Sequence, residues 1–345
     1  GVAVDGAQQN AHVNYAALWE KVYMTNVGID ATILGGKINL TTDYFVKNTK
    51  DILLQPVTLA TLGWGTAAFA NQGQTRNRGI EAVVTYNGIV GDEFKYSVSG
   101  NISYIKNEIL SLGDFNESVS GYWINRVGSS VGDYYGYKSD GLFTSQEEID
   151  AHPSQTAIAG NSKVGDIKYV DVNGDGVLNT DDRTILGNDV PWVNYGFNFK
   201  AAYKDFDIDV LTYGVAGVKT YMEGEAVQPF FNNGNVKSNW LNNGWTEENN
   251  VANADFPRIT TVADAPQNYI TSDFWLFSGN YFRIRAITLG YTFPAESISK
   301  IGMSQLRVFA SSNNPFTVLG DKRLGDFDPE TGSGRPGYPG LKTFS

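Results

Sequence analysis

The sequence contains no cysteine and only two histidines, His12 and His152, among its 345 residues. Without cysteine, the protein has neither a disulfide framework nor thiolate chemistry. The two histidines lie in unrelated segments, and neither an H-E-x-x-H pair nor a nucleophile elbow is present. These absences argue against an enzyme, and we assign the chain no catalytic residue and no organic cofactor.

The chain also lacks long apolar runs and an excess of positive charge. No apolar stretch approaches the ~18 residues of a transmembrane helix. Its 26 Lys and Arg residues are outnumbered by 37 Asp and Glu residues, which gives a formal net charge of −11. This balance, without a basic stripe, argues against nucleic acid as a partner. No signal peptide begins at Gly1, so we interpret the chain as lacking the front of an exported protein.

What the sequence does contain is alternation of apolar and polar residues, most clearly between Glu81 and Lys106. Successive side chains of a strand point to opposite faces, so the pattern predicts a β-hairpin that turns at Val90-Gly91-Asp92. One face of its second strand is apolar and the other polar. Strands of about ten residues with this alternation are typical of membrane β-barrels, although soluble sandwiches also alternate.

Six further strands are expected at about 27–33, 38–47, 194–203, 206–213, 283–293 and 305–313, and a last one begins at Lys342. Their connections alternate in length. Short turns lie at 35–36, 91–92, 204–205 and about 294–303, and long segments at about 51–75, 107–192, 219–280 and 314–340. Outer-membrane barrels place short turns in the periplasm and long loops outside, whereas a sandwich gives no reason for such sorting.

The fold class predicted from these features is all-β, an antiparallel transmembrane β-barrel. Nine strands do not close an even-stranded barrel, and an open edge in lipid would leave backbone groups unpaired. We therefore interpret residues 1–345 as the C-terminal part of a larger barrel, incomplete at both ends. Residues 107–192 and 219–280 would form long extracellular loops.

Within the first long loop, Asp171-Val-Asn-Gly-Asp-Gly-Val-Leu-Asn-Thr-Asp-Asp182 matches the twelve-residue calcium loop. The expected ligands are Asp171, Asn173, Asp175, the carbonyl of Val177, Asn179 and Asp182. Position 12 departs from the pattern, because Asp182 replaces the usual Glu. Since the flanks do not predict long helices, we expect a structural calcium ion rather than a sensor. The alternative is a plain polar turn.

Four stretches follow one another along the chain in a recognisable order. They are Tyr134–Phe143, Val164–Gly187, Tyr281–Tyr291, and Asp326–Glu330 with Gly337-Tyr-Pro339. Together they resemble the signature of the SusC/RagA-type TonB-dependent transporters. The segments Trp19-Glu-Lys21 and Gly28-Ile-Asp30 are a weaker similarity.

The resemblance implies a plugged, 22-stranded barrel in the outer membrane of a Gram-negative cell. It also implies a SusD-type surface lipoprotein as partner, and import of oligosaccharides or peptides with energy transmitted by TonB. The plug and the TonB box have no counterpart in these residues. The alternative from another class is a soluble, calcium-stabilised carbohydrate-binding or adhesin β-module, which would fold without detergent.

Four aromatic residues of the long segment 219–280 are candidates for contact with substrate or partner: Phe230, Phe231, Trp240 and Trp245. Aromatic faces flanked by amides suit sugars and peptides alike. Self-packing of these aromatics, or contact with the lipoprotein, is the competing interpretation.

The alternation also predicts which side chains contact lipid. The expected lipid-facing residues are Tyr96, Val98, Ile102, Tyr195, Phe197 and Phe199. The expected lumen-facing residues are Lys95, Ser97, Asn101, Asn194, Asn198 and Lys200. Five tyrosines would lie near the strand ends as an interfacial girdle: Tyr86, Tyr104, Tyr195, Tyr203 and Tyr291.

Overall fold

The computed structural model describes residues 14–55, 67–325, 327–330, 334 and 341–344. Asp326 and the Gly337-Tyr-Pro339 motif lie outside the described residues. Within the described part of the chain, no helix is both long enough and apolar enough to cross a bilayer.

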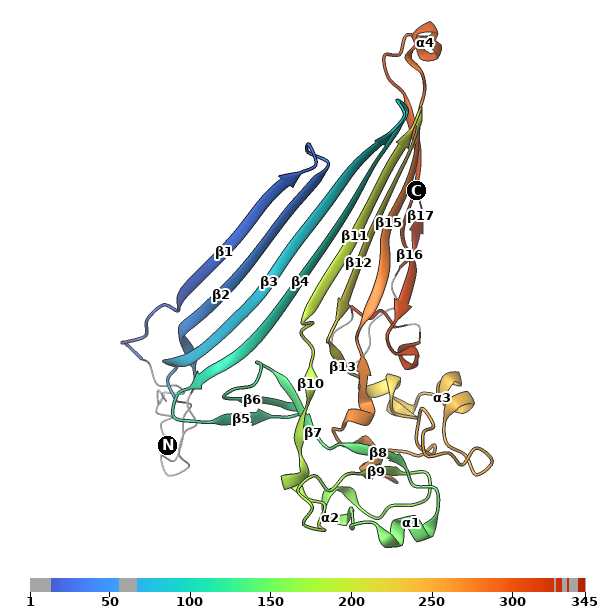
Figure 1. Ribbon diagram of the computed structural model, residues 1–345. Coiled ribbons are helices and arrows are strands. Elements are labelled where there is room, and N and C mark those ends of the chain that lie inside the picture. Colours follow the sequence, from blue (N-terminus) through green and yellow to red (C-terminus); the bar gives the residue numbers. More distant parts are fainter. Residues whose placement is uncertain (1–13, 56–66, 326, 331–333, 335–340, 345) are drawn as a thin grey trace, which may run out of the picture.

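The dominant feature is one antiparallel sheet of nine strands in the order β1-β2-β3-β4-β11-β12-β15-β16-β17 (Figure 1). The strands are β1 (Lys21–Ile33), β2 (Ile38–Leu54), β3 (Ala70–Val90), β4 (Phe94–Leu112), β11 (Val193–Tyr203), β12 (Phe206–Ala216), β15 (Tyr281–Thr292), β16 (Arg307–Leu319) and β17 (Thr343–Phe344). Along the sheet the strands keep their order in the chain, and the strands of the long connections are not part of it. The predicted nine antiparallel strands are therefore confirmed.

Cross-strand register places the predicted apolar row on one face of the sheet. Val98 lies opposite Phe199, and Ile102 opposite Tyr195. The polar row lies on the other face, where Ser97 is opposite Lys200. Polar side chains pair with one another there, for example Lys200 with Asp209 at 3.0 Å. We call the two surfaces the apolar face and the polar face.

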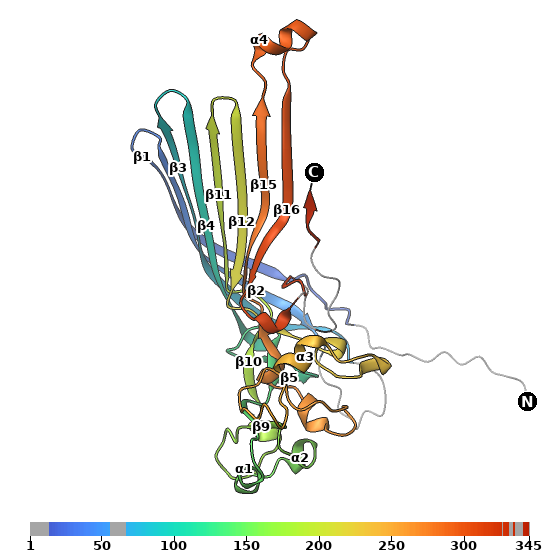
Figure 2. The same ribbon diagram turned by 90° about the vertical axis from the view of Figure 1, so that its right-hand side faces the viewer.

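The connections sort to opposite ends of the sheet, as expected (Figure 2). All four short connections lie at one end. The fourth is longer than a simple turn, because it contains α4 (Ala295–Ile298) and a 3-10 helix (Ser299–Ile301) before β16.

Several predicted strand ends are wrong because bulges interrupt the alternation. β2 continues to Leu54 and β3 begins at Ala70, so the first long connection covers 55–69 rather than 51–75. The ladder shifts register between Thr49 and Ile52, where Asp51 has a φ of +61°. A bulge inserts a residue and exchanges the faces beyond it, so the two-residue period stops there. Asn314, with a φ of +51°, lies within β16 in the same way.

Three long connections fold together at the other end of the sheet, and we call their residues 113–192, 217–280, 320–325 and 327–330 the loop domain (Figure 1). Its strands are β5 (Glu117–Ser120), β6 (Trp123–Arg126), β7 (Asp133–Gly136), β8 (Ser139–Leu142), β9 (Ile167–Tyr169), β10 (Thr184–Asn188), β13 (Lys219–Tyr221) and β14 (Leu276–Ser278). Its α-helices are α1 (Gln146–Ala151), α2 (Thr156–Ala159) and α3 (Ser238–Asn243). Short 3-10 helices span Thr180–Asp182, Gly224–Ala226, Phe231–Asn233, Pro266–Tyr269, Asp273–Trp275 and Lys322–Leu324.

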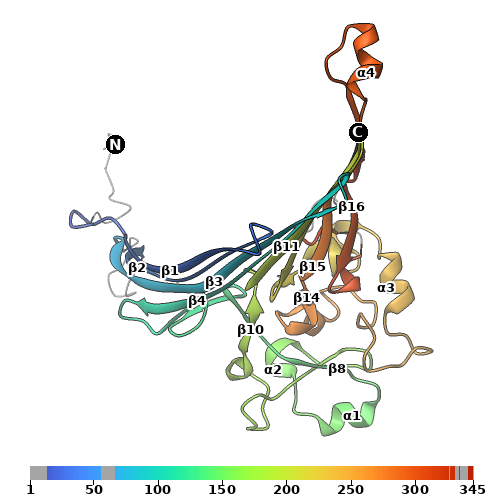
Figure 3. The same ribbon diagram turned by 45° about the horizontal axis from the view of Figure 1, so that its top comes forward.

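The large buried cluster lies in the loop domain and not on the sheet. The sheet is curved (Figure 3). In the described residues no second sheet packs on its apolar face, where Phe197 is 53% exposed and Ile102 50%. A soluble sandwich would bury such a row against another layer. The arrangement is that of a barrel wall, and the sandwich alternative is wrong.

Aromatic side chains gather at the turn end of the sheet. Phe94 lies 5.6 Å from Tyr96 and 6.5 Å from Tyr203 between ring centroids, and Phe206 lies 4.7 Å from Tyr291. Amphipathic rings prefer the boundary between hydrocarbon and water. This cluster therefore matches one of the two girdles that border the apolar band of an outer-membrane barrel.

Candidate functional site

The aromatics singled out in the 219–280 segment form the core of the loop domain. Trp240 is 2% exposed and stacks on Phe256 at a centroid distance of 4.6 Å. Its indole Nε1 donates to the carbonyl oxygen of Pro257 at 3.1 Å. Trp245 is also buried and donates through Nε1 to Asn250 Oδ1 at 2.9 Å. Such satisfied, buried indoles support the domain's packing.

Trp240 and Trp245 are therefore not positioned to contact a substrate or partner, and self-packing describes them better. Phe230 differs from them, because its side chain is 47% exposed. Its backbone adopts a left-handed conformation with φ +60°, which is uncommon for a bulky residue. Phe231, the next residue, is partly exposed. These two phenylalanines remain the accessible part of the predicted contact set.

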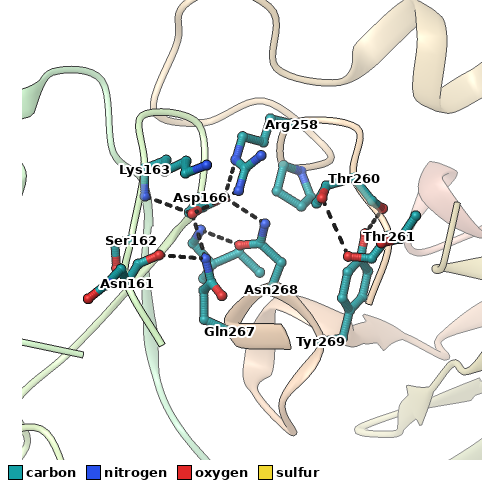
Figure 4. Close-up of polar contacts among 12 residues, drawn as sticks. Asn161, Ser162, Lys163, Asp166, Arg258, Thr260, Thr261, Gln267, Asn268 and Tyr269 are labelled. Atoms are coloured by element: carbon teal, nitrogen blue, oxygen red, sulfur yellow. Dashed lines mark hydrogen bonds and ion pairs between the residues drawn. The ribbon is translucent and has the colours of Figure 1, made fainter. Parts of the chain in front are cut away.

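The most elaborate polar cluster surrounds Asp166, whose side chain is fully buried (Figure 4). Its carboxylate accepts from Arg258 Nε at 2.5 Å, from Gln267 Nε2 at 2.7 Å and from Asn268 Nδ2 at 2.8 Å. The backbone N–H of Lys163 donates to it at 2.8 Å. A buried carboxylate is stable only when its lone pairs are satisfied in this way.

This cluster joins the two long connections that were expected from the sequence to be separate loops. Asp166 belongs to the first, and its three side-chain partners belong to the second, 92 to 102 residues further along the chain. Asn268 also accepts the N–H of Ile167 at 2.9 Å. The two segments thus fold as one unit, which was not foreseeable from their periodicity.

The predicted calcium loop is an exposed, tightly turned segment between β9 and β10. Gly176 has a φ of +82°, which accounts for glycine at that position. The carboxylate of Asp171 accepts the N–H groups of Gly174 and Gly176, both at 2.7 Å. The hydrogen bond from Gly176 is the main cause of the lowered pKa of Asp171. As expected, neither flank is a long helix: the strands β9 and β10 lie on either side of the loop.

The loop's donor chemistry suits calcium, which prefers carboxylate, amide and carbonyl oxygens. In the conformation described, these oxygens accept backbone N–H groups instead of converging. Asp182 is fully buried and accepts from Val172 N and Asn179 N, both at 2.8 Å. In the described parts of the chain, no three Asp, Glu, His or Cys side chains are arranged to hold a metal ion. Calcium binding therefore stays a prediction and would require these side chains to turn toward one point.

Two neighbouring hollows lie where the polar face of the sheet meets the loop domain. The larger has a volume of about 700 Å³, and its lining includes Tyr213, Tyr281 and Arg285. The smaller has a volume of about 320 Å³, and its lining includes Trp192 and Asn194. Pro191 lines both. The hydroxyl of Tyr213 donates to Asn194 Oδ1 at 2.8 Å, which connects their walls.

Three charged side chains line the larger hollow: Arg285 and Glu330, which compensate each other, and Asp189, for which the described residues provide no ion pair. Arg285 Nη2 contacts Glu330 Oε1 at 2.5 Å, and Tyr281 donates its hydroxyl to the same oxygen at 2.7 Å. Arg283, whose side chain is 4% exposed, pairs with Asp328 at 2.7 Å. Burial is the largest single influence on the pKa of Asp328 and raises it, but the hydrogen bonds from Arg283 and from the N–H of Glu330, with the charges of Arg283 and Arg285, together outweigh burial and leave that pKa lowered.

Sequence analysis did not single out these arginines as site residues, although their spacing in the sequence could have indicated them. In a regular strand Tyr281, Arg283 and Arg285 would share a face. The structure has a bulge between Ile284 and Ala286, yet both arginines contact Glu330, at 3.2 Å from Arg283 and 2.5 Å from Arg285. Their acidic partners lie in the Asp326–Glu330 motif. Two of the stretches that carry the family resemblance thus meet at this hollow.

Comparison with known proteins was made at the level of family models, curated sequences and solved structures. No family model matches. The chain is 29% identical over 341 residues to "TonB-dependent receptor P26" of Formosa agariphila, covering 96% of this chain and 33% of the relative. It is 26% identical over 338 residues to "TonB-dependent receptor SusC" of Bacteroides thetaiotaomicron, covering 94% and 31%. The chain thus spans about a third of the length of these relatives.

Two solved structures of a RagAB peptide importer share the fold. The "open-open" state superposes with a TM-score of 0.79 at 20% identity, over 99% of this chain and 36% of that chain. The "closed-closed" state gives a TM-score of 0.74 at 20% identity, over 94% and 35%. At this identity the likeness establishes the fold. Together with the sequence relatives, it confirms the resemblance drawn from the motifs. None of these relatives is named as an enzyme.

Proposed function

We propose that this chain, a relative of the SusC/RagA-type TonB-dependent transporters, forms part of the barrel wall of an outer-membrane nutrient importer. The observation that carries the proposal is the sheet itself. It is a single curved layer with an exposed apolar face, a polar face, short turns at one end and a folded loop domain at the other. These are the properties of a strand array between lipid and an aqueous lumen.

In this proposal the apolar face contacts lipid and the polar face lines the lumen. The short turns lie in the periplasm, and the loop domain lies outside the cell. Because the loop domain has its own buried core and the Asp166 cluster, it would present a rigid surface at the mouth of the barrel. Such a surface suits docking of a preformed partner better than a set of independent loops would.

The partner that fits this position is a surface lipoprotein of the SusD type. Phe230 is exposed on the loop domain, and aromatic side chains are enriched at protein interfaces. We assign Phe230 and Phe231 to that contact. TonB would supply the energy through other parts of the whole protein, and the cargo class at this level is oligosaccharide or peptide.

A calcium ion is the second component of the proposal. Asp171, Asn173, Asp175, Asn179, Asp182 and the carbonyl of Val177 are the proposed ligands. Bringing three carboxylates together is unfavourable without a cation. Calcium would therefore fix the loop between β9 and β10, and its role would be structural.

Uptake by cells that produce the whole protein tests the proposal. The gene is deleted and restored by complementation, with TonB present or absent. Accumulation of radiolabelled oligosaccharide and peptide pools is then measured. We expect uptake of one pool to require both the gene and TonB. Uptake of both pools that is unaffected by the deletion would contradict an importer, and recovery of the whole protein in the aqueous fraction would favour the soluble module.

A further inference from the structure

Of the two hollows on the polar face, the smaller has a lining rich in amides, and the larger contains one carboxylate without an ion pair among the described residues, that of Asp189. In the smaller hollow the polar side chains are those of Asn77, Asn107, Ser130, Asn188 and Asn194, with Trp192 beside them. No ionisable side chain lines it. In the larger hollow Arg285 is paired with Glu330. A ligand that fits this lining offers hydroxyl groups and apolar faces rather than net charge.

Trp192 is placed to act as a stacking platform. It precedes β11, lines the smaller hollow and is 47% exposed. Continuing the β11–β12 register puts Gly217 across from it, and a Cβ at Gly217 would lie 3.2 Å from the Cβ of Trp192. Gly217 also has a φ of +75°, which favours glycine. The missing side chain therefore leaves one side of the tryptophan uncovered.

A second aromatic, Tyr213, lines the larger hollow on the same face. Continuing the β11–β12 register puts it across from Gly196, which also lines that hollow. Its ring is 5.3 Å from the guanidinium of Arg285, and its hydroxyl donates to Asn194. Trp192 and Tyr213 thus lie on one face, with the amide of Asn194 between the two hollows.

The amides keep hydrogen-bonding capacity after their structural contacts are counted. Asn107 Nδ2 donates to Asn77 Oδ1 at 2.8 Å, and Asn107 Oδ1 accepts Val131 N at 2.8 Å. Neither Asn77 Nδ2 nor Asn194 Nδ2 donates a hydrogen bond within the described residues. Each amide nitrogen carries two N–H donors. These groups would donate to hydroxyl oxygens of a ligand over the rings.

We propose that the two hollows form one binding site for a neutral oligosaccharide, with one sugar stacked on Trp192 and another beside Tyr213. This inference rests on the proposed function and specifies its cargo class. A peptide would bring a charged terminus or ionised side chains to the smaller hollow, where no ionisable side chain of the described residues would pair with them. Sugar rings, in contrast, have apolar faces that stack on aromatics and hydroxyls that exchange hydrogen bonds with amides.

The test is binding to the purified whole transporter with its lipoprotein in detergent. Two probes are applied: a pool of oligosaccharides from partial hydrolysis of neutral polysaccharides, and a tryptic peptide pool. Bound material is identified by mass spectrometry, and the affinity of the retained sugars is measured by calorimetry. We expect retention of sugars. We expect Trp192→Ala to weaken their binding about tenfold or more and Trp192→Phe to restore most of it.

Tyr203→Ala is the matched control, because Tyr203 lies on the apolar face at the other end of β11 and is 51% exposed. It should leave sugar affinity unchanged. Heat-modifiable mobility in gels establishes that each variant forms its barrel. Retention of peptides alone, retention of neither pool, or sugar affinity that Trp192→Ala leaves unchanged would overturn the inference. Cellular uptake of a cargo that requires TonB would still support the importer in each of those cases.

Discussion

Removal of the Asp166 carboxylate should loosen the loop domain without affecting the sheet. Asp166→Ala deprives Arg258, Gln267, Asn268 and the N–H of Lys163 of their shared acceptor. Gln267 and Asn268 are as fully buried as Asp166, so water replaces little of what is lost. Removing one partner of a buried ion pair costs about 3–5 kcal/mol. Arg258 is 21% exposed in its side chain and partly rehydrates, which places the expected loss toward the lower end.

Hydrogen exchange measured on the whole transporter resolves this effect by segment. A loss of about 3 kcal/mol corresponds to exchange roughly a hundredfold faster in residues 163–169 and 256–269. Asp166→Asn keeps one acceptor oxygen and should have a smaller effect. Asp181→Ala, at an exposed position in the same connection, should change exchange little. Unchanged exchange in either segment after Asp166→Ala would refute the view that this carboxylate joins the two connections.

Three further predictions concern the sheet, the calcium loop and pH. Val98→Arg on the apolar face should cost about 2–4 kcal/mol and Ser97→Arg much less, as measured by unfolding in lipid; equal costs would contradict the assigned faces. Asp175→Ala or chelation should increase protease cleavage between about Lys163 and Asn188 and leave the strands intact, and magnesium should replace calcium poorly; identical cleavage with calcium, magnesium and chelator would indicate a plain polar turn. Hydrogen bonds from Lys168 and from the N–H of Thr144 hold the pKa of Glu148 below its ordinary value of 4.5. Its stabilisation of α1 is therefore complete above that value and is lost as the pH falls through the lowered pKa, so amide exchange in 144–151 should rise there, and Glu148→Gln should abolish the pH dependence.

The sheet was predictable because its information is local. Alternation with a period of two residues is visible within one strand, as between Lys95 and Tyr104, and the turn at Gly91 is visible beside it. The predicted faces agree with the register throughout β4 and β11. Prediction failed where the backbone departs from regular pleating, as at Asp51 and Asn314, because a single inserted residue exchanges the two faces.

The loop domain was less predictable because its contacts are between distant residues. Nothing near Asp166 in the sequence indicates that its partners lie about a hundred residues away. The exposure of Trp192 likewise depends on Gly217, which follows the end of the next strand, β12. Trp240 and Phe230 look equivalent in the sequence, yet one is buried and the other exposed. Composition identified the aromatics, and tertiary packing decided which of them remain accessible.

The orientation of adjacent residues on β11 tests the central claim most directly. This chain contains no cysteine, so Phe197→Cys and Asn198→Cys are made separately in the whole transporter with every cysteine outside this chain replaced by serine. Each is spin-labelled in lipid bilayers, and its accessibility to oxygen and to a water-soluble nickel complex is measured. The account predicts that the label at 197 is reached by oxygen, which concentrates in lipid, and that the label at 198 is reached by the nickel complex. Equal access of the nickel complex to both positions, or the reverse order, would contradict a barrel wall between lipid and lumen.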